Sequence, residues 1–531
     1  MFLQRVANRG IRMGTLFERA AARNPETMLY LDHVLDIYPH LGSRFTVAEV
    51  ADLIRDISSR LWSVGVRPGS RVAVYKSNNL DVTLLAFAAA RIGAVPIPLS
   101  SALDAGTTVL LLRRAGRPFL VTDQAGFETL QPHSVVDAVA RVVLATGSHC
   151  AAVAWDSLAG AERVPAVPRD PHHPTMITHT SGATGTPKLV LHTGASFEAC
   201  LRPLLWAMAA VVPRRETFAF HIAFAHSRIV TALAFPLLRG FPVVLLAKGA
   251  PDHAAEVFAR FRPGVVEAHP HSFTEWESLA EDPSAPFASV RLFGCAFDAL
   301  RPRTVKRLLG ASLRRAPIFV TAYGQSEIGP VVSRAFTRRR DVHEEGRCVG
   351  LAFPGVTQVR VVSRNGRPPS ATDPGHIEVR SDGRARTYVG EDERFEQNIT
   401  ADGWWRMGDV GYRTKWGCLH LLNREVDVID GFGSTLGAED QLLSAMAQLT
   451  QVVILRAHHE LPVPVVCTVD DLPLDTGAWK AASGGLPPMA QPVHLPTQRI
   501  PLTGTGKVKR RELAHLLAEE RKTSRPAGPR N

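Results

Sequence analysis

The chain has 531 residues, of which 45% are hydrophobic and 21% are charged, and it carries a formal net charge of +11. This length exceeds one usual hydrophobic core, so we expect two or more domains of a globular protein. No apolar run of 18 residues and no secretory signal are present, so the sequence predicts no membrane span and a cytoplasmic location. Lys and Arg are spread along the chain without interleaved aromatic residues, so we expect an anionic substrate rather than nucleic-acid binding.

The first 150 residues alternate between helical and strand patterns. Asp81 is the predicted N-cap of a helix that Gly93 ends. The alternation continues through the apolar segments PVVLLA, GVVEAHP and PIFVTAYG, which are predicted strands. The pattern indicates a layered α/β architecture. Predicted helices span residues 13–22, 47–64 and 81–93, and predicted strands span residues 71–75 and 95–100.

The segment HTSGATGTPK, residues 179–188, places small hydroxyl residues and two glycines ahead of a lysine. Glycines let the backbone turn with positive φ, the hydroxyls offer donors, and Lys188 adds a cation. The segment is not a Walker loop, because Leu189 follows the lysine. It predicts polyphosphate binding, hence ATP, with a polar surface turn as the alternative. The predicted ATP-binding residues here are Thr180, Ser181, Gly182, Ala183, Thr184, Gly185 and Lys188.

The segment AYGQSE, residues 322–327, supplies what attack on the α-phosphate of ATP requires. The ring of Tyr323 can stack on adenine, and Gly324 lets the backbone come close. Ser326 can donate to the α-phosphate, and Glu327 can hold Mg²⁺. Alone, the pentapeptide YGQSE, residues 323–327, also fits an ordinary strand followed by a turn.

After residue 350 the pattern changes to short strands, VTQVRVV and HIEVRS, separated by a turn-rich segment. This pattern predicts a small antiparallel sheet or barrel. A domain boundary is expected near residues 424–430. Beyond it we predict a helix over 438–449, the strands VVIL and VPVVCTV, a terminal helix over 510–520 and a disordered tail over 521–531.

Five motifs stand in a fixed order, the last three being GWWRMGD from Gly403, LNREVDVI from Leu422 and PLTGTGKVKR from Pro501. Together they resemble the acyl-adenylate-forming superfamily, which includes acyl-CoA synthetases, peptide synthetase adenylation domains and beetle luciferases. The resemblance runs nearly end to end. It implies a large layered α/β domain with a small β-barrel-like part over 1–424, and a small mobile α+β domain over 425–520.

The resemblance also implies roles for individual residues. Asp409 matches a ribose ligand, and Arg424 matches its companion arginine. Lys507 matches the lysine that bridges the substrate carboxylate and ATP and that leaves when the small domain rotates. The predicted catalytic residues are Lys507, Ser326 and Glu327, with Glu327 as the metal ligand. The predicted ATP contacts outside the loop are Tyr323, Gly324, Gln325, Ser326, Asp409, Arg424 and Lys507.

The substrate pocket is predicted from weaker signals. His226 aligns with a histidine that borders the acyl pocket in many acyl-CoA synthetases, although His221 competes for the same alignment. A histidine in an apolar segment is also often a satisfied core residue. The predicted substrate contacts are His226, Ala322 and Gly324.

The chain departs from the family pattern at five positions. Ala183 replaces a hydroxyl residue of the phosphate loop, and Leu189 replaces a glycine. Phe297 stands where proline is common. Asn423 stands where glycine normally precedes the arginine, and Val426 takes the hinge position usually held by Asp or Lys. The hinge difference bears on the second half-reaction.

The leading hypothesis is an ATP- and Mg²⁺-dependent ligase that forms an acyl- or aryl-AMP and transfers the acyl group to CoA. One alternative is a stand-alone adenylating enzyme with another acceptor, a carrier protein or an amine, or with an unusual oxyanion such as the nitrite of diazo-forming biosynthesis. Another is a catalytically silent nucleotide-binding relative, which the joint presence of Glu327, Asp409 and Lys507 argues against. The Ala- and Arg-rich composition favours a bacterial role in specialised metabolism.

Overall fold

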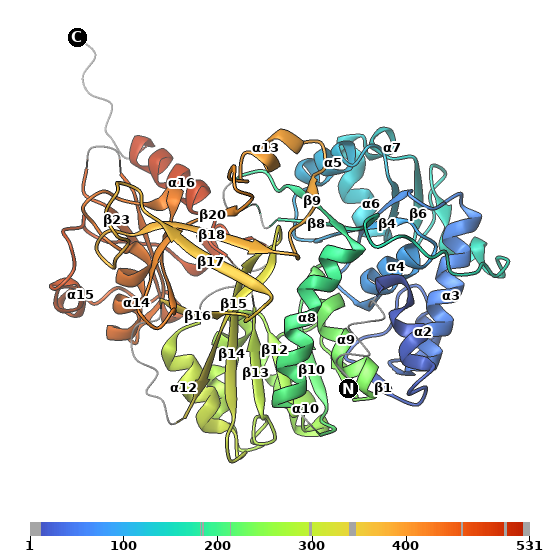
Figure 1. Ribbon diagram of the computed structural model, residues 1–531, viewed down its shortest axis with the longest axis horizontal. Coiled ribbons are helices and arrows are strands. Elements are labelled where there is room, and N and C mark those ends of the chain that lie inside the picture. The colour runs from blue at the N-terminus through green and yellow to red at the C-terminus, as the bar shows by residue number, and fades with distance from the viewer. Residues whose placement is uncertain are drawn as a thin grey trace, which may run out of the picture.

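The computed structural model describes residues 12–180, 182, 185–212, 214–296, 300–338, 347–457, 460–503 and 507–523. Three residues of the predicted phosphate loop, Ser181, Ala183 and Thr184, lie outside the described residues. In Figure 1 the N-terminal helices, in blue, lie on one side of the molecule, and the C-terminal elements, in orange and red, lie on the other.

A parallel sheet forms the first layered unit. Its strand order is β4 (Val95–Leu99), β3 (Arg71–Tyr75), β5 (Phe119–Thr122), β6 (Arg141–Leu144) and β7 (Val153–Ala154). The accompanying helices are α3 (Val47–Ser63), α4 (Leu80–Arg91), α5 (Ala105–Arg114), α6 (Gln124–Leu130) and α7 (Val135–Ala138). The predicted helix over 47–64 is confirmed, and Thr46 and Glu49 cap it reciprocally. The strand predicted over 71–75 is also confirmed.

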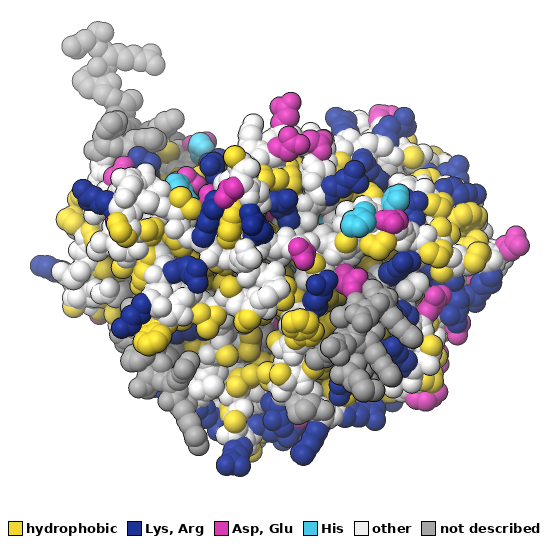
Figure 2. Space-filling model, in the orientation of Figure 1, with side chains coloured by type: hydrophobic (Ala, Val, Ile, Leu, Met, Phe, Trp, Pro, Cys, Tyr) yellow, Lys and Arg dark blue, Asp and Glu magenta, His cyan; other side chains and the backbone are white. Residues whose placement is uncertain are grey.

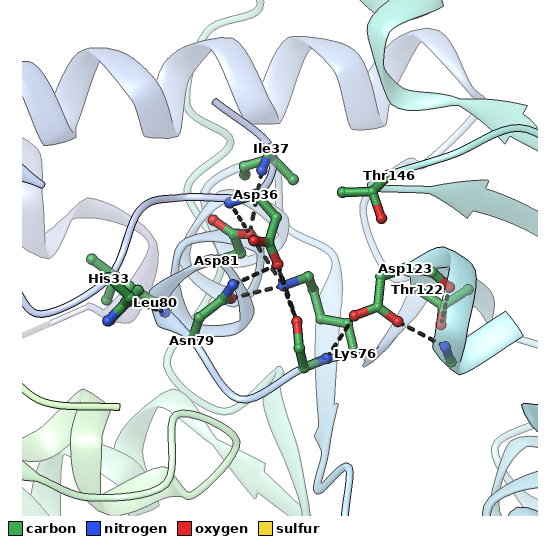
Figure 3. A network of polar contacts seen from close by, with 12 residues as sticks. His33, Asp36, Ile37, Lys76, Asn79, Leu80, Asp81, Thr122, Asp123 and Thr146 are labelled. Atoms are coloured by element: carbon green, nitrogen blue, oxygen red, sulfur yellow. Dashed lines mark hydrogen bonds and ion pairs between the residues drawn. The ribbon is translucent and has the colours of Figure 1, made fainter. Parts of the chain in front are cut away.

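Asp81 is not the N-cap that the sequence suggested. Asn79 holds that position, and Asp81 is fully buried inside α4. Its Oδ2 accepts the backbone N–H groups of Asp36 and Ile37 at 3.0 and 3.3 Å and lies 3.1 Å from Lys76 Nζ. Figure 3 shows these groups converging on the lysine. A buried ammonium needs carboxylate partners, and this requirement outweighs capping.

A second, larger sheet of thirteen strands runs through the described residues. Its parallel part contains β14 (Ile318–Gln325), β13 (Leu292–Cys295), β12 (Val265–Ala268), β10 (Phe218–His221), β11 (Val243–Leu245) and β1 (Met28–Leu31), with β2 (Arg44–Thr46) at the edge. Helices α2 (Leu16–Ala21), α8 (Gly194–Val211), α9 (Ser227–Arg239), α10 (Pro251–Phe261), α11 (Pro270–Glu275) and α12 (Pro302–Ala311) accompany it. Phe218, Phe220 and Phe235 belong to the hydrophobic core that α9 shares with this sheet.

The remaining strands of the large sheet are antiparallel. They are β15 (Gly329–Thr337), β16 (Cys348–Ala352), β21 (Leu419–Arg424), β20 (Trp405–Arg413), β18 (Gly375–Ser381) and β17 (Thr357–Val362). Because β17 also contacts β15, this part curls, as the predicted antiparallel, barrel-like region requires. A separate three-stranded sheet holds β19 (Thr387–Tyr388), β9 (Leu189–Thr193) and β8 (Pro174–His179), and the phosphate loop joins β8 to β9.

The C-terminal part has hydrophobic clusters of its own, drawn only from residues after 428. It comprises α14 (Thr435–Ala445), β22 (Leu449–Leu455), β23 (Val463–Thr468), α15 (Thr476–Ser483), β24 (Val493–His494) and α16 (Arg510–Thr523). The boundary at 424/425 stays a prediction, although β21 ends there. The predicted disordered tail is wrong at residues 521–523, which continue α16, and residues 524–531 lie outside the described residues. The predicted fold class is confirmed.

Asn423 ties the end of β21 to the start of the C-terminal part. Its buried side chain donates to the carbonyl oxygen of Gly433 at 2.8 Å and accepts from the backbone and hydroxyl of Thr435 at 2.9 and 2.7 Å. A second link is the ion pair between Arg347 and Asp440 at 2.6 Å. These contacts join the two parts in the arrangement that the structure shows.

Two predictions about the surface and the membrane can be compared with the structure. No helix among the described residues is both long and apolar enough to cross a membrane. On the face shown in Figure 2, Lys and Arg side chains are distributed among hydrophobic and acidic ones rather than gathered into one patch.

Candidate active site

One cavity of about 490 Å³ collects most of the predicted site residues. Gly185 and Tyr323 are not among its lining residues. In the described part of the chain, the lining carries seven Lys or Arg side chains against two carboxylates, so the cavity favours anions. The predicted residues that line it are Thr180, Gly182, Lys188, His226, Ala322, Gly324, Gln325, Ser326, Glu327, Asp409, Arg424 and Lys507.

The phosphate loop is closed at its base by Thr180 and Lys188. The backbone N–H of Thr180 donates to the carbonyl oxygen of Lys188, and the N–H of Lys188 donates to the Thr180 hydroxyl, each at 3.0 Å. Gly182 has a φ of +70°, and a Cβ there would lie 2.9 Å from Pro187 Cγ. Only glycine fits this turn without strain.

Lys188 is connected to Glu327 through the buried Tyr388. Its Nζ donates to the Tyr388 hydroxyl at 3.3 Å and lies 4.8 Å from the ring centre. That hydroxyl donates to Glu327 Oε1 at 2.7 Å. Burial lowers the pKa of Lys188, and the negative charge of Glu327 opposes that shift. The lysine is thus held beside a carboxylate before any phosphate arrives.

Glu327 can hold the predicted Mg²⁺ only together with oxygen atoms of a bound phosphate group. It is 7% exposed, it lines the cavity, and its carboxylate supplies the hard oxygen donors that Mg²⁺ prefers. No group of three potential metal-ligating side chains occurs among the described residues. A single carboxylate that is completed by phosphate oxygens is a usual Mg²⁺ site, so the residues present fit this ion.

The AYGQSE segment forms the end of β14 and the turn after it. A Cβ at Gly324 would collide with the carbonyl oxygen of Gly329, so the close backbone approach requires glycine. The Tyr323 hydroxyl donates to Asp409 Oδ2 at 2.5 Å, and burial together with that carboxylate raises the pKa of Tyr323. Tyr323 therefore positions Asp409. Asp409 in turn lies directly opposite Arg424 in the β20–β21 pairing, so the predicted ribose pair is brought together.

Lys507 reaches the cavity from a short hairpin. Its N–H donates to the Thr503 hydroxyl at 3.0 Å, and its carbonyl oxygen accepts from the Thr503 N–H at 2.8 Å. Residues 504–506 lie outside the described residues. Arg511, in the first turn of α16, lines the same cavity. The C-terminal part thus contributes two cations.

His226 caps α9 as well as lining the cavity. Its ring Nδ1 accepts the backbone N–H of Arg228 at 3.0 Å, so the neutral ring carries its proton on Nε2. Burial, assisted by the charges of Lys507 and Arg228 among its neighbours, lowers its pKa to about 3. His221 does not line the cavity and pairs with the Ser272 hydroxyl at 2.9 Å. The geometry therefore favours His226 over His221.

Several lining residues carried no motif. His192, in β9, is buried, and burial lowers its pKa to about 4. Arg228 forms an ion pair with Glu267 of β12 at 2.5 Å. The available signals were a polar residue within LVLHT and a carboxylate within the apolar strand GVVEAHP. Neither pattern predicts that the side chain takes part in a cavity or an ion pair.

Comparison with known proteins yields similar sequences along the whole chain. A family model described as "AMP-binding enzyme" matches residues 17–389. The 3-amino-2-hydroxy-4-methoxybenzoate diazotase of Streptomyces cremeus is 41% identical, over 98% of this chain and 98% of that protein. The feruloyl-CoA synthase of an Amycolatopsis species is 26% identical, over 89% of this chain and 94% of that protein.

The fold has close counterparts among solved structures. ATP-bound MatB from Rhodopseudomonas palustris superimposes with a TM-score of 0.78, over 96% of this chain and 99% of that chain. Its sequence is 19% identical, so the likeness concerns the fold.

Proposed function

The chain belongs to the AMP-binding enzyme family, as its motifs predicted, and we propose that it uses ATP to activate nitrite for the diazotisation of an aromatic amine. The observation that carries this proposal is the full-length 41% identity to a protein named as a diazotase. Identity to a CoA ligase of the same family is 26%. Nitrite activation was one of the alternatives that the sequence left open.

The first step joins nitrite to AMP. A nitrite oxygen attacks the α-phosphorus of ATP, the bond to the β-phosphate oxygen breaks, and pyrophosphate leaves with the electron pair. Lys188 and Lys507 offset the charge that develops around the phosphorus, and Asp409 with Arg424 orients the nucleotide. Mg²⁺, held by Glu327 and phosphate oxygens, supplies further charge neutralisation when it is bound. The product is a nitrosyl–AMP anhydride.

The second step transfers the nitrosyl group. The amine nitrogen attacks the nitrosyl nitrogen, the N–O bond to AMP breaks, and the amine loses one proton. The N-nitrosoamine then tautomerises, takes up a proton and loses water to give the diazonium. AMP, pyrophosphate and water balance the overall reaction of amine, nitrite and ATP. No step of this reaction requires a thiol acceptor.

His226 is suited to hold the small oxyanion. Its Nδ1 accepts from the backbone N–H of Arg228, so the neutral ring carries its proton on Nε2. The low pKa keeps the ring neutral at pH 7. A neutral donor can bind a nitrite oxygen without trapping it as an ion pair. We propose that the His226 ring, which lines the cavity, contacts that oxygen.

The test is product formation from nitrite. Enzyme, ATP, Mg²⁺, ¹⁵N-nitrite and 3-amino-2-hydroxy-4-methoxybenzoate are expected to yield AMP and a diazo product that contains one ¹⁵N atom, detected by mass after azo coupling. Lys507→Ala should slow formation of both products by about 10²- to 10³-fold. Lys509→Ala, which removes a nearby lysine paired to Glu512, should not. AMP release that requires no nitrite would contradict the proposal.

Transfer of an activated carboxylate to CoA is the second candidate. It is favoured by the similarity to feruloyl-CoA synthase over 89% of this chain. The same assay distinguishes the two, with aromatic acids and CoA in place of nitrite and amine. An acyl-CoA product without nitrite-dependent AMP would replace the nitrite proposal with this one.

A further inference from the structure

A small inner pocket adjoins the main cavity on the side away from the phosphate loop. Its volume is about 60 Å³, and five residues line both spaces: Leu204, Arg228, Thr231, Ala296 and Ala322. The inner pocket lies between α8, α9 and the parallel strands β10, β12 and β13. No described residue of the phosphate loop lines the inner pocket, and neither do Glu327, Asp409, Arg424 and Lys507.

The described walls of the inner pocket are mainly apolar, and their polar side chains include one buried ion pair and Thr231. Phe218, Phe220 and Phe235 supply aromatic surface. Among them, the carboxylate of Glu267 accepts from Nε and Nη2 of Arg228 at 2.5 and 2.7 Å. Only 9% of the Glu267 side chain and 14% of the Arg228 side chain are exposed. A charged pair costs free energy in such surroundings, so its presence calls for a role.

The guanidinium of Arg228 is fixed on two of its three edges. Glu267 occupies the edge formed by Nε and Nη2, and Nη1 donates to the Thr231 hydroxyl at 3.1 Å. That hydroxyl donates back to the Arg228 carbonyl oxygen at 2.9 Å. One N–H of Nη1 and one N–H of Nη2 keep no protein partner among the described residues. Two parallel N–H groups at one edge match a carboxylate.

We propose that this pocket binds the acceptor amine, and that Arg228 holds a carboxylate on its aromatic ring. A pocket of about 60 Å³ is too small for a whole ring, since cavities that bind benzene are nearer 150 Å³. The ring therefore lies at the mouth, among the five shared residues, with its carboxylate toward Arg228. The acceptor class is an aminobenzoate, and the ion pair with Glu267 pre-orients the arginine for it.

This placement puts the amine beside the activated nitrite. His226 is two residues from Arg228 on the same helix terminus, and the charges of both Arg228 and Lys507 reach its ring. His226 therefore lines the same cavity as the carboxylate-binding arginine and the lysine of the adenylation step. The amine, which is meta to the carboxylate in a 3-aminobenzoate, then faces the nitrosyl nitrogen. Both substrates then meet in one cavity without a thiol carrier.

The inference rests on the proposed function, and its test uses two amines that differ by one carboxylate. These are 3-amino-2-hydroxybenzoate and 2-aminophenol, each with ATP, Mg²⁺ and nitrite. Wild type should prefer the benzoate by about 10- to 100-fold in kcat/KM, as expected for a charge-assisted hydrogen-bonded pair. The variant R228M/E267Q should reduce that preference to about threefold or less. Removing both charges together avoids a buried unpaired ion.

The matched control is R307M/E281Q, which removes a surface ion pair of 2.7 Å between Arg307 of α12 and Glu281, the last residue of the 3-10 helix over Trp276–Glu281. It should keep the wild-type preference. A second measurement needs no variant: salicylate, which lacks the amine, should inhibit wild type competitively against the aminobenzoate and not against nitrite.

The outcomes separate the two proposals. If nitrite supports no AMP release with either amine, the proposed function fails, and the inference fails with it. If nitrite is turned over with both amines at equal efficiency, or R228M/E267Q folds and keeps the preference, the inference alone is overturned. Salicylate inhibition that competes with nitrite would also overturn it.

Discussion

The two ends of the cavity use charge differently. The nucleotide end, defined by Thr180, Lys188, Glu327, Asp409 and Lys507, lies largely on loops and strand ends in a polar setting. Its cations outnumber its carboxylates because four arginines, Arg394, Arg406, Arg424 and Arg511, line the same cavity. The inner end, defined by the inner pocket, lies between helices and a sheet face, where Arg228 is neutralised by Glu267 among phenylalanines. The cations of the nucleotide end attract any anionic group. At the inner end we propose that Arg228, held by Glu267, selects a carboxylate by the geometry of its N–H groups.

The largest expected effect comes from the nucleotide end. Lys507→Ala should lower kcat by about 10²- to 10³-fold with every amine, because one cation facing the developing phosphate charge is lost. The ratio of kcat/KM between 3-amino-2-hydroxybenzoate and 2-aminophenol should not move. A changed ratio, measured by AMP release, would show that the two ends are not separate.

Asp409→Asn should have the next largest effect. We expect KM for ATP to rise about 10- to 100-fold, since a buried carboxylate that accepts from sugar hydroxyls becomes neutral. Tyr323→Phe should give a smaller rise, because Asp409 stays charged and loses one donor. Steady-state kinetics at varied ATP test both variants. An equal rise in KM for the amine would contradict the separation.

At the inner end, Thr231→Val should change only the amine. The loss of the acceptor for Arg228 Nη1 loosens the guanidinium, so KM for 3-amino-2-hydroxybenzoate should rise about 2- to 10-fold. The matched control is Thr129→Val, an exposed threonine on α6 whose hydroxyl also donates to its own helix. If KM for 2-aminophenol rises as much, Thr231 does not act through the carboxylate.

The smallest effect concerns pH. Burial lowers the pKa of His192 to about 4 in the folded state, from an ordinary 6.5. Between pH 6.5 and 4 the unfolded chain binds a proton that the folded chain does not, so stability is intact above pH 6.5 and falls as the pH drops. One such group contributes at most about 1.4 kcal/mol per pH unit. His192→Gln should therefore lose less Tm than wild type between pH 6.5 and 4.5, and an unchanged slope would assign the loss to other groups.

The nucleotide end was largely predictable from sequence, and the inner end was not. Phosphate binding requires specific residue types within short segments, so Lys188 and Gly182 stand in a recognisable loop. Arg228 and Glu267 are 39 residues apart and meet only because β10 pairs with β12. Local patterns also misled at Asp81, where a capping residue type serves a buried lysine instead. Connections made by tertiary packing have no local signature.

Asn423 is hydrogen-bonded to Gly433 and Thr435, so the segment that joins the two parts of the chain is a closed loop. The two parts can rotate about this segment only when these hydrogen bonds break. Three hydrogen bonds of about 1 kcal/mol each put the opened state at about 1% of molecules. We propose that the rotation of the small part, which the resemblance implies, breaks these hydrogen bonds in each cycle. Cross-linking the small part to the large one should then stop turnover, and turnover that persists would show that the cycle needs no rotation.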